Sequence, residues 1–137
     1  MNILVLCTGN SCRSQIAEGY LRHYAGDKAT IYSAGIQAHG LNPKAVQVMA
    51  EDGIDISAHT SNLVSDYDPI SFDYVITVCD NANEACPYFP GNVNRLHQNF
   101  PDPAKAIGTD DQIIDAFRNV RDMIKIYAET FINNLPG

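Results

Sequence analysis

Residues 7–14, with the sequence CTGNSCRS, combine a nucleophile with an anion-binding side chain. Cys7 opens the stretch and Arg13 stands six positions later. A thiolate is a strong nucleophile, and a guanidinium can hold two oxygens of a tetrahedral anion at once. The positive charge of Arg13 also favours the thiolate form of Cys7, because a free thiol has a pKa of about 8.5. The stretch therefore predicts a nucleophilic cysteine that acts on a bound oxyanion.

A buried strand and a helix are expected to position this stretch. Residues 3–6, with the sequence ILVL, form an apolar run without polar alternation, which is typical of a strand buried on both faces. A helix is predicted over residues 14–25, and its first N–H groups and partial positive charge would face an anion. The alternative is that Cys7 is only a buried residue at a strand end. The polar loop and Arg13 that follow disfavour it.

The rest of the chain alternates between strand and helix patterns. Further strands are predicted over residues 29–33, 72–78 and 93–96, and further helices over 43–53, 80–86 and 110–133. No regular element is predicted over 62–71. The alternation predicts an α/β fold in one domain, residues 1–137, with a four-stranded parallel sheet, helices on both faces and flavodoxin-like winding. In this class the ligand lies beyond the carboxyl ends of the strands.

The composition excludes several classes of protein. The chain has 137 residues, of which 45% are hydrophobic and 18% charged, as in ordinary globular proteins. Its net charge of −7 opposes binding to nucleic acid and to acidic membranes, and no basic run offsets it. No leader pattern and no apolar run of membrane length are present. We therefore expect a cytoplasmic monomer without a membrane or nucleic-acid partner.

A second cysteine is expected near the first. Cys79 follows a predicted strand just as Cys7 does, and neighbouring parallel strands would bring both to one sheet edge, within disulfide reach. Four cysteines in a cytoplasmic chain call for an explanation, because thiols there stay reduced unless they are catalytic or redox-active. A zinc site with Cys79, Cys86, Cys12 and His97 is an alternative that lacks the paired spacing of structural zinc sites.

Residues 7–14 resemble the phosphate loop of low-molecular-weight tyrosine phosphatases, and still more closely that of the thioredoxin-coupled arsenate reductases built on the same fold. The similarity continues over most of the chain, in residues 32–36, 54–57, 59–61, 75–79, 86–87 and 102–103. This resemblance implies the fold already predicted from the strand and helix patterns.

Five positions separate the two branches of this family. The phosphatases usually have proline where Gln15 stands and a tyrosine after the Asp-Pro pair, where this chain has Ala104 and Lys105. The reductases add cysteines at the positions of Cys79 and Cys86, and both are present. The resemblance therefore favours an arsenate reductase, with a phosphatase as the alternative. A non-catalytic oxyanion-binding or redox-sensing protein is the further alternative from another class.

The resemblance implies a cascade of three thiols without a bound cofactor. Cys7 would attack arsenate, Arg13 and the loop amides would hold its oxygens, and Asp102 would act as the general acid. Cys79 would then attack Cys7, which releases arsenite, and Cys86 would attack Cys79. Thioredoxin would supply the electrons by reducing the final disulfide.

The remaining expectations concern the loop and a possible ion. The residues expected to bind the substrate are Thr8, Gly9, Asn10, Ser11, Cys12, Arg13 and Ser14. The side chain of Asn10 would brace the loop, and the hydroxyl of Ser14 would hydrogen-bond the thiolate. Cys12 has no required chemical role, and His59 is expected to be structural. A potassium ion held by Asn10, Glu18 and Ser33 is implied for some reductases of the family, with its acidic partner near Ser65 or Asp66.

The spacing of the last two cysteines predicts a conformational change. Residues seven apart on a helix are about 10.5 Å apart along its axis. A disulfide needs Cα atoms within about 7 Å. We therefore expect residues 80–91 to be ordered when Cys79 and Cys86 are reduced and to loop out when they are joined.

Overall fold

The computed structural model describes residues 1–84, 89 and 91–136. Its elements in chain order are β1 (Asn2–Cys7), α1 (Arg13–Ala25), β2 (Thr30–Gly35), α2 (Pro43–Glu51), the 3-10 helix η1 (Val64–Tyr67), β3 (Tyr74–Thr77), α3 (Asp80–Glu84), β4 (Asn94–His97), the 3-10 helix η2 (Pro103–Lys105) and α4 (Asp110–Asn133).

The four strands form one parallel sheet in the order β2-β1-β3-β4. The four apolar side chains at the centre of β1 are fully buried, as expected of an internal strand: Ile3, Leu4, Val5 and Leu6. The predicted four-stranded parallel sheet with flavodoxin-like winding is thus confirmed. Because β1 and β3 are neighbours, Cys7 and the residues after Thr77 meet at one edge of the sheet.

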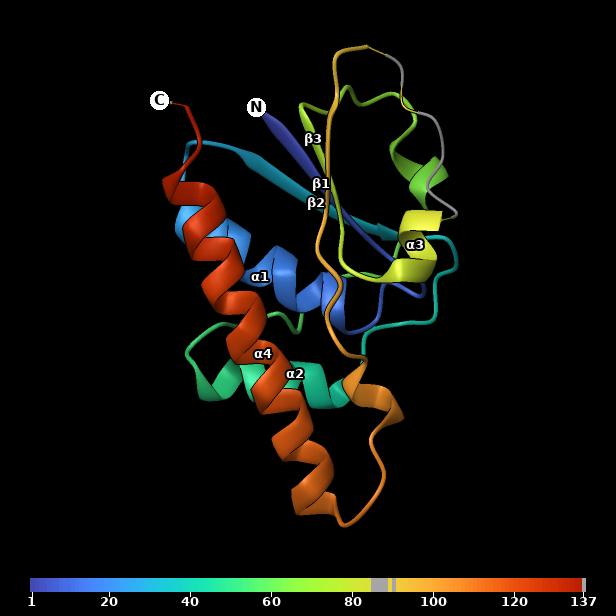
Figure 1. Ribbon diagram of the computed structural model, residues 1–137, viewed down its shortest axis with the longest axis vertical. Coiled ribbons are helices and arrows are strands. Elements are labelled where there is room, and N and C mark those ends of the chain that lie inside the picture. The colour runs from blue at the N-terminus through green and yellow to red at the C-terminus, as the bar shows by residue number, and fades with distance from the viewer. Residues whose placement is uncertain (85–88, 90, 137) are drawn as a thin grey trace.

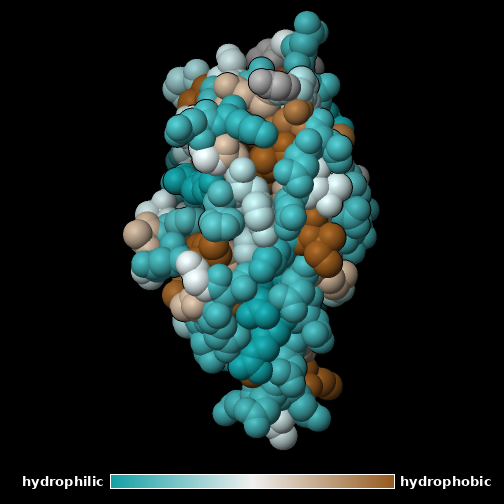
Figure 2. Space-filling model, turned by 90° about the vertical axis from the view of Figure 1, so that its left-hand side faces the viewer, coloured by the Kyte–Doolittle hydropathy of each residue, from teal (hydrophilic) through white to brown (hydrophobic). Residues whose placement is uncertain are grey.

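Helices cover both faces of the sheet, as predicted (Figure 1). Side chains alternate along β2, so that Ser33 donates a hydrogen bond to Glu18 of α1 while Tyr32 packs edge-on against Tyr67 of η1. On the face of the sheet that α1 covers, Tyr74 of β3 contacts Phe131 of α4. The face that α4 presents to solvent is mostly hydrophilic, and its apolar patches are small and separate (Figure 2).

The structure places the ends of several elements differently from the sequence prediction. β1 extends to Cys7 because this residue pairs with Gly35 of β2. α1 begins at Arg13, one residue earlier than predicted. η1 lies in the segment 62–71, where no element was predicted, and Asp66 there accepts a hydrogen bond from the backbone of Leu63. The predicted helix 80–86 is α3, and residues 85 and 86 lie outside the described residues.

The structure confirms two further helices and shows their caps; α2 ends at Glu51, two residues before the predicted end. Asn42 caps α2 through its side chain, which accepts from the backbone of Lys44. α4 has the predicted bounds, and Thr109 and Gln112 form a capping box at its start. Among the described residues, no helix combines the length and the hydropathy needed to cross a membrane.

A polar cluster joins α1, α2 and α4 at their crossing. The hydroxyl of Tyr20 donates to Asp52 at 2.6 Å, and the ammonium of Lys125 donates to the same carboxylate oxygen at 2.8 Å. The hydrogen bonds from Lys125 and Tyr20 lower the pKa of Asp52. The cluster therefore stabilises the folded chain only while Asp52 is ionised.

We expect Asp52→Asn to reduce the stability of the chain at neutral pH by about 1 kcal/mol, since a partly exposed charged pair is worth little more. A carboxyl with a lowered folded pKa stabilises the fold above its unfolded pKa of about 4, and this contribution is lost as the pH falls toward the folded value. Urea unfolding of variant and parent should therefore differ at neutral pH and converge below about pH 4. The exposed Asp27→Asn is the control, and a difference that persists in acid contradicts the assignment.

Candidate functional site

The loop between β1 and α1 turns its backbone carbonyls away from its inner side. Three of them accept hydrogen bonds of 2.9 Å from the segment 36–42: Thr8 from Gln37, Gly9 from His39 and Ser11 from Asn42. Asn10 has a φ of 49°, and its carbonyl accepts from the side chain of Gln15 at 3.0 Å. A peptide points its C=O and N–H in opposite directions, so the loop N–H groups face inward. Such a ring of amides binds anions.

Gly35 allows the segment 36–42 to lie against the loop. A Cβ on Gly35 would lie 2.8 Å from both the nitrogen of Asn10 and the carbonyl oxygen of Thr8, and it would clash with the carbonyl of Gln37. All three neighbours are backbone atoms, which cannot move aside cheaply. A side chain here would therefore force the loop apart from the residues that orient it.

Two thiols meet behind the loop. Cys7 and Cys79 are both buried, and the hydroxyl of Thr8 lies 3.3 Å from the sulfur of Cys79. Hydrogen bonding between the two thiols lowers the pKa of Cys79 and, together with burial, raises the pKa of Cys7. Arg13 lowers both. Ionisation of one thiol therefore opposes ionisation of the other.

Arg13 and Asp102 lie on opposite segments that close around the same space. The guanidinium of Arg13 donates to the carbonyl of Phe100 at 2.9 Å and lies 3.7 Å from the carboxylate of Asp102. Asp102 also caps η2, because its side chain accepts from the backbone of Ala104. The hydrogen bond to Phe100 orients the guanidinium of Arg13. The other N–H groups of Arg13 and the carboxylate of Asp102 are close enough to contact the same ligand.

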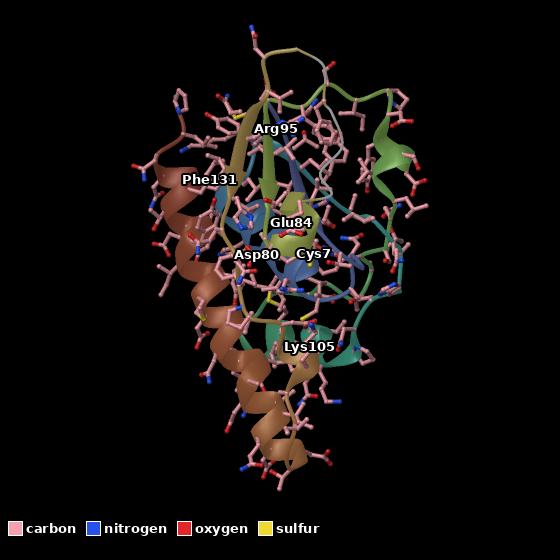
Figure 3. The ribbon with its side chains drawn as sticks, turned by 45° about the vertical axis from the view of Figure 1, so that its right-hand side comes forward. Cys7, Asp80, Glu84, Arg95, Lys105 and Phe131 are labelled. Carbon is pink, nitrogen blue, oxygen red and sulfur yellow. The ribbon has the colours of Figure 1, made fainter. Side chains whose placement is uncertain are left out.

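A pocket of about 570 Å³ lies at this edge of the sheet. Its polar lining includes Thr8, Arg13, Cys79, Asp80, Asp102 and Lys105. Figure 3 shows Cys7 and Asp80 at the same edge of the sheet, with Lys105 on the η2 side. The structure thus brings the predicted nucleophile, anion-binding arginine, second cysteine and general acid together. The third predicted cysteine, Cys86, lies outside the described residues.

Cys12 is a thiol of low reactivity. It is 4% exposed at the residue before α1, and burial, with a further contribution from Asp102, raises its pKa to about 12. This agrees with the absence of a required chemical role for Cys12. In the part of the chain that the structure describes, no group of three His, Cys, Asp or Glu side chains could hold a metal ion, so the zinc alternative gains no support.

The residues predicted to hold potassium form a hydrogen-bonded chain. The amide of Asn10 donates to Ser33 at 3.0 Å and to Ser14 at 2.8 Å, and Ser33 donates to Glu18 at 2.5 Å. The side-chain oxygen Oδ1 of Asn10 accepts from the backbone N–H of Asn62 at 2.7 Å. The side chain of Asn10 therefore turns its amide protons, not its oxygen, toward Ser33. Asn10 therefore braces the loop as predicted, and the hydroxyl of Ser14 contacts Asn10.

This chain fits a potassium ion poorly. Arg22 pairs with the carboxylate of Glu18 at 2.8 Å and already supplies a positive charge. Only Glu18 and Ser33 remain as oxygen donors, fewer than a hard cation needs. Every buried side-chain nitrogen or oxygen among the described residues has a hydrogen-bond partner. Asp66, a candidate acidic partner, is bonded to Leu63 instead. Potassium binding by this chain therefore stays a prediction.

Gln15 supports the loop, a role that was not predicted from the sequence. Its side chain is fully buried and donates to the carbonyls of Asn10 and Thr60 at 3.0 and 2.9 Å, while its carbonyl oxygen lies 3.1 Å from His59. His59 is thus part of the loop support, as its expected structural role requires. A long polar side chain in the first turn of a helix that opens an anion site was the available signal.

Comparisons with known proteins agree with this geometry. A family described as low molecular weight phosphotyrosine protein phosphatase matches residues 2–136. An arsenate reductase from Halalkalibacterium halodurans is 52% identical over 132 residues, which span 93% of this chain and 95% of the relative. A solved arsenate reductase in the phosphate-binding state has a TM-score of 0.79 and 29% identity, covering 98% of both chains. A thioredoxin-dependent arsenate reductase from Corynebacterium glutamicum has a TM-score of 0.69 and 27% identity over 96% of this chain and 61% of the other.

We expect Gln15→Leu to weaken the binding of inorganic phosphate at least about tenfold, because an apolar side chain would leave the carbonyl of Asn10 without its donor. Unfolding by urea should also show a loss of about 1–3 kcal/mol. The measurement is calorimetric titration with phosphate. Gln47→Leu, on the exposed face of α2, is the matched control. Unchanged phosphate affinity in Gln15→Leu would show that the loop orients itself without this support.

Proposed function

The chain belongs to the low molecular weight phosphotyrosine protein phosphatase family, and from this premise we propose that it reduces arsenate to arsenite with three cysteines. The observation that carries the proposal is Cys79, a second buried thiol at the edge of the oxyanion loop, whose sulfur lies 3.3 Å from the hydroxyl of Thr8, the residue after the nucleophile Cys7. Hydrolysis of a phosphate ester needs one thiol, whereas reduction by two electrons needs a second one within bonding reach of the first.

In the first step Cys7 attacks arsenic. The proton of the Cys7 thiol passes to the adjacent Cys79, which leaves Cys7 as the attacking thiolate. The loop amides and Arg13 stabilise the oxygens as charge builds on them. A bond from sulfur to arsenic forms, one arsenic–oxygen bond breaks, and Asp102 donates a proton so that the oxygen leaves as water.

In the second step Cys79 attacks the sulfur of Cys7. A disulfide forms, the sulfur–arsenic bond breaks, and its electron pair stays on arsenic, which leaves as arsenite. Cys79 gives up the proton it had received, and the departing arsenite takes it. The hydroxyl of Thr8 and the backbone N–H of Ala82, which lies 3.4 Å from the sulfur, favour the attacking thiolate.

In the third step Cys86 attacks Cys79, Cys7 leaves as a thiolate, and the disulfide moves to Cys79 and Cys86. A dithiol such as thioredoxin then reduces this bond by exchange. The proposal places the enzyme in the cytoplasm, where such dithiols are kept reduced. The similarity to a thioredoxin-dependent relative supports this choice of electron donor.

A weak phosphatase activity is a second candidate, because Cys7, Arg13 and Asp102 could also form and hydrolyse a phosphocysteine. The positively charged Lys105 lines the pocket instead of the tyrosine expected in the phosphatases. An aryl phosphate would therefore lack an aromatic contact, and we expect a low rate on p-nitrophenyl phosphate.

We expect arsenate to drive continuous NADPH oxidation when the chain is combined with thioredoxin and thioredoxin reductase. Cys79→Ser should abolish this turnover, since no second sulfur could take the bond to Cys7. Cys86→Ser should allow one turnover and then stop, because the disulfide of Cys7 and Cys79 would remain buried. NADPH absorbance follows turnover, and mass spectrometry identifies the disulfides.

Gln47→Ser, on the exposed face of α2 and away from the loop, is the control; its turnover should match that of the parent. Sustained turnover in Cys86→Ser would remove the third cysteine from the proposal. No arsenate-dependent NADPH oxidation by the parent chain would refute the reductase function altogether.

A further inference from the structure

A histidine and a carboxylate connect β4 to the start of α3. The ring of His97 lies 2.8 Å, through Nε2, from the carboxylate of Asp80 and 2.7 Å, through Nδ1, from the hydroxyl of Thr77. Because a carboxylate can only accept, Nε2 of His97 is the donor to Asp80. Asp80 directly follows Cys79 and lines the pocket. Figure 3 shows Asp80 close to Cys7, at the end of β1.

The backbone around this pair fixes the same two segments to each other. Gln98 and Phe100 donate to the carbonyls of Thr77 and Val78, which extends the pairing of β4 beyond its last residue. The backbone N–H of Asp80 donates to the side chain of Asn99 at 3.1 Å. The first residue of α3 is thus held at its backbone by Asn99 and at its side chain by His97.

The position of α3 determines the contacts of Cys79. The backbone N–H of Ala82, in the first turn of α3, points at the sulfur of Cys79 from 3.4 Å. The described residues of α3, Asp80–Glu84, form little more than one turn, and a single turn of helix has no stability of its own in water. Contacts with neighbouring segments must therefore hold its first turn over the sulfur.

We propose that His97 is a positioning residue that, by holding the carboxylate of Asp80, keeps the first turn of α3 over Cys79 and aims its sulfur at Cys7. The role rests on the proposed function, in which Cys79 attacks Cys7. Asp80 is 71% exposed and His97 29% exposed, so neither side chain is needed to fill the core. Their contact therefore serves the local geometry more than the global stability.

The first test measures the step that uses Cys79. In a Cys86→Ser background, one equivalent of arsenate is added to the reduced chain, and mass spectrometry follows formation of the disulfide between Cys7 and Cys79. We expect His97→Ala and Asp80→Ala each to slow this step about tenfold, as the loss of a hydrogen bond to a charged group implies. The double variant should be no slower than either single one.

Conservative and control variants separate positioning from a general loss of structure. His97→Gln can place a donor near Asp80 and should recover most of the rate. His23→Ala, on the exposed side of α1, should match the parent. Phosphate affinity should change by less than about twofold in the variants of His97 and His23, which do not line the pocket, and Asp80→Ala, which removes a negative charge from the lining, should not weaken it. Rate losses that add in the double variant, or no loss in Asp80→Ala, would overturn the proposal.

The second test does not depend on arsenate. The ultraviolet absorbance of the Cys79 thiolate is titrated in a Cys7→Ser background, as the difference from a chain that also carries Cys79→Ser, so that the coupled titration of Cys7 does not contribute. Arg13, the cation that acts on Cys79, is unchanged in every variant, and Asp80 is the one charged group near Cys79 that a variant removes. Loss of the Ala82 contact should move the titration of Cys79 to higher pH in both single variants.

Asp80→Ala distinguishes lost positioning from a simple change of charge, because the two effects shift the pKa of Cys79 in opposite directions. Removing a nearby negative charge alone would lower the pKa of Cys79, so a rise in Asp80→Ala indicates lost positioning and a fall refutes it. A parent chain that does not reduce arsenate would end the proposed function, whereas this titration would still decide the role of His97.

Discussion

An anion pocket made of backbone amides requires successive peptides of a loop to turn the same way, and the rest of this structure depends on that constraint. Peptides have no intrinsic preference for such an arrangement, so something behind the loop must hold their carbonyls. Here the segment 36–42 and the side chain of Gln15 take that part. Gly35 makes the close approach possible, because any Cβ would lie between two backbones.

Charge in the site is balanced locally, since the chain as a whole carries a net charge of −7. Arg13 is the cation shared by the incoming oxyanion and the two thiols. Two adjacent thiolates in a buried place would be costly, so ionisation of Cys7 and ionisation of Cys79 oppose each other. Transfer of a proton between the two thiols would let each sulfur act as the nucleophile in its turn.

One stretch of backbone after β4 links the parts of the site that would act in different steps. Its first residues hold the start of α3 next to Cys79. Phe100 receives the guanidinium of Arg13, and Asp102 follows two residues later. A shift of this stretch would therefore disturb oxyanion binding and the second thiol together.

The sequence alone determined the features that depend on neighbouring residues. The apolar run of β1, the loop that follows it and the capped amphipathic α4 each carry a local pattern, and the rule for parallel sheets placed Cys79 beside Cys7. The predicted role of Cys86 as the third thiol stays a prediction, because this residue lies outside the described residues.

Only the tertiary structure decided how the loop is supported. Gln15 reaches Thr60, 45 residues away, and Asn10 receives the backbone N–H of Asn62. The contact of His97 with Asp80 likewise joins the end of β4 to the start of α3, which are adjacent in space but separated in sequence by residues 81–96. No local pattern encodes such contacts, because hydrogen bonds between distant residues depend on the strand order and on which residues the packed helices bring within reach.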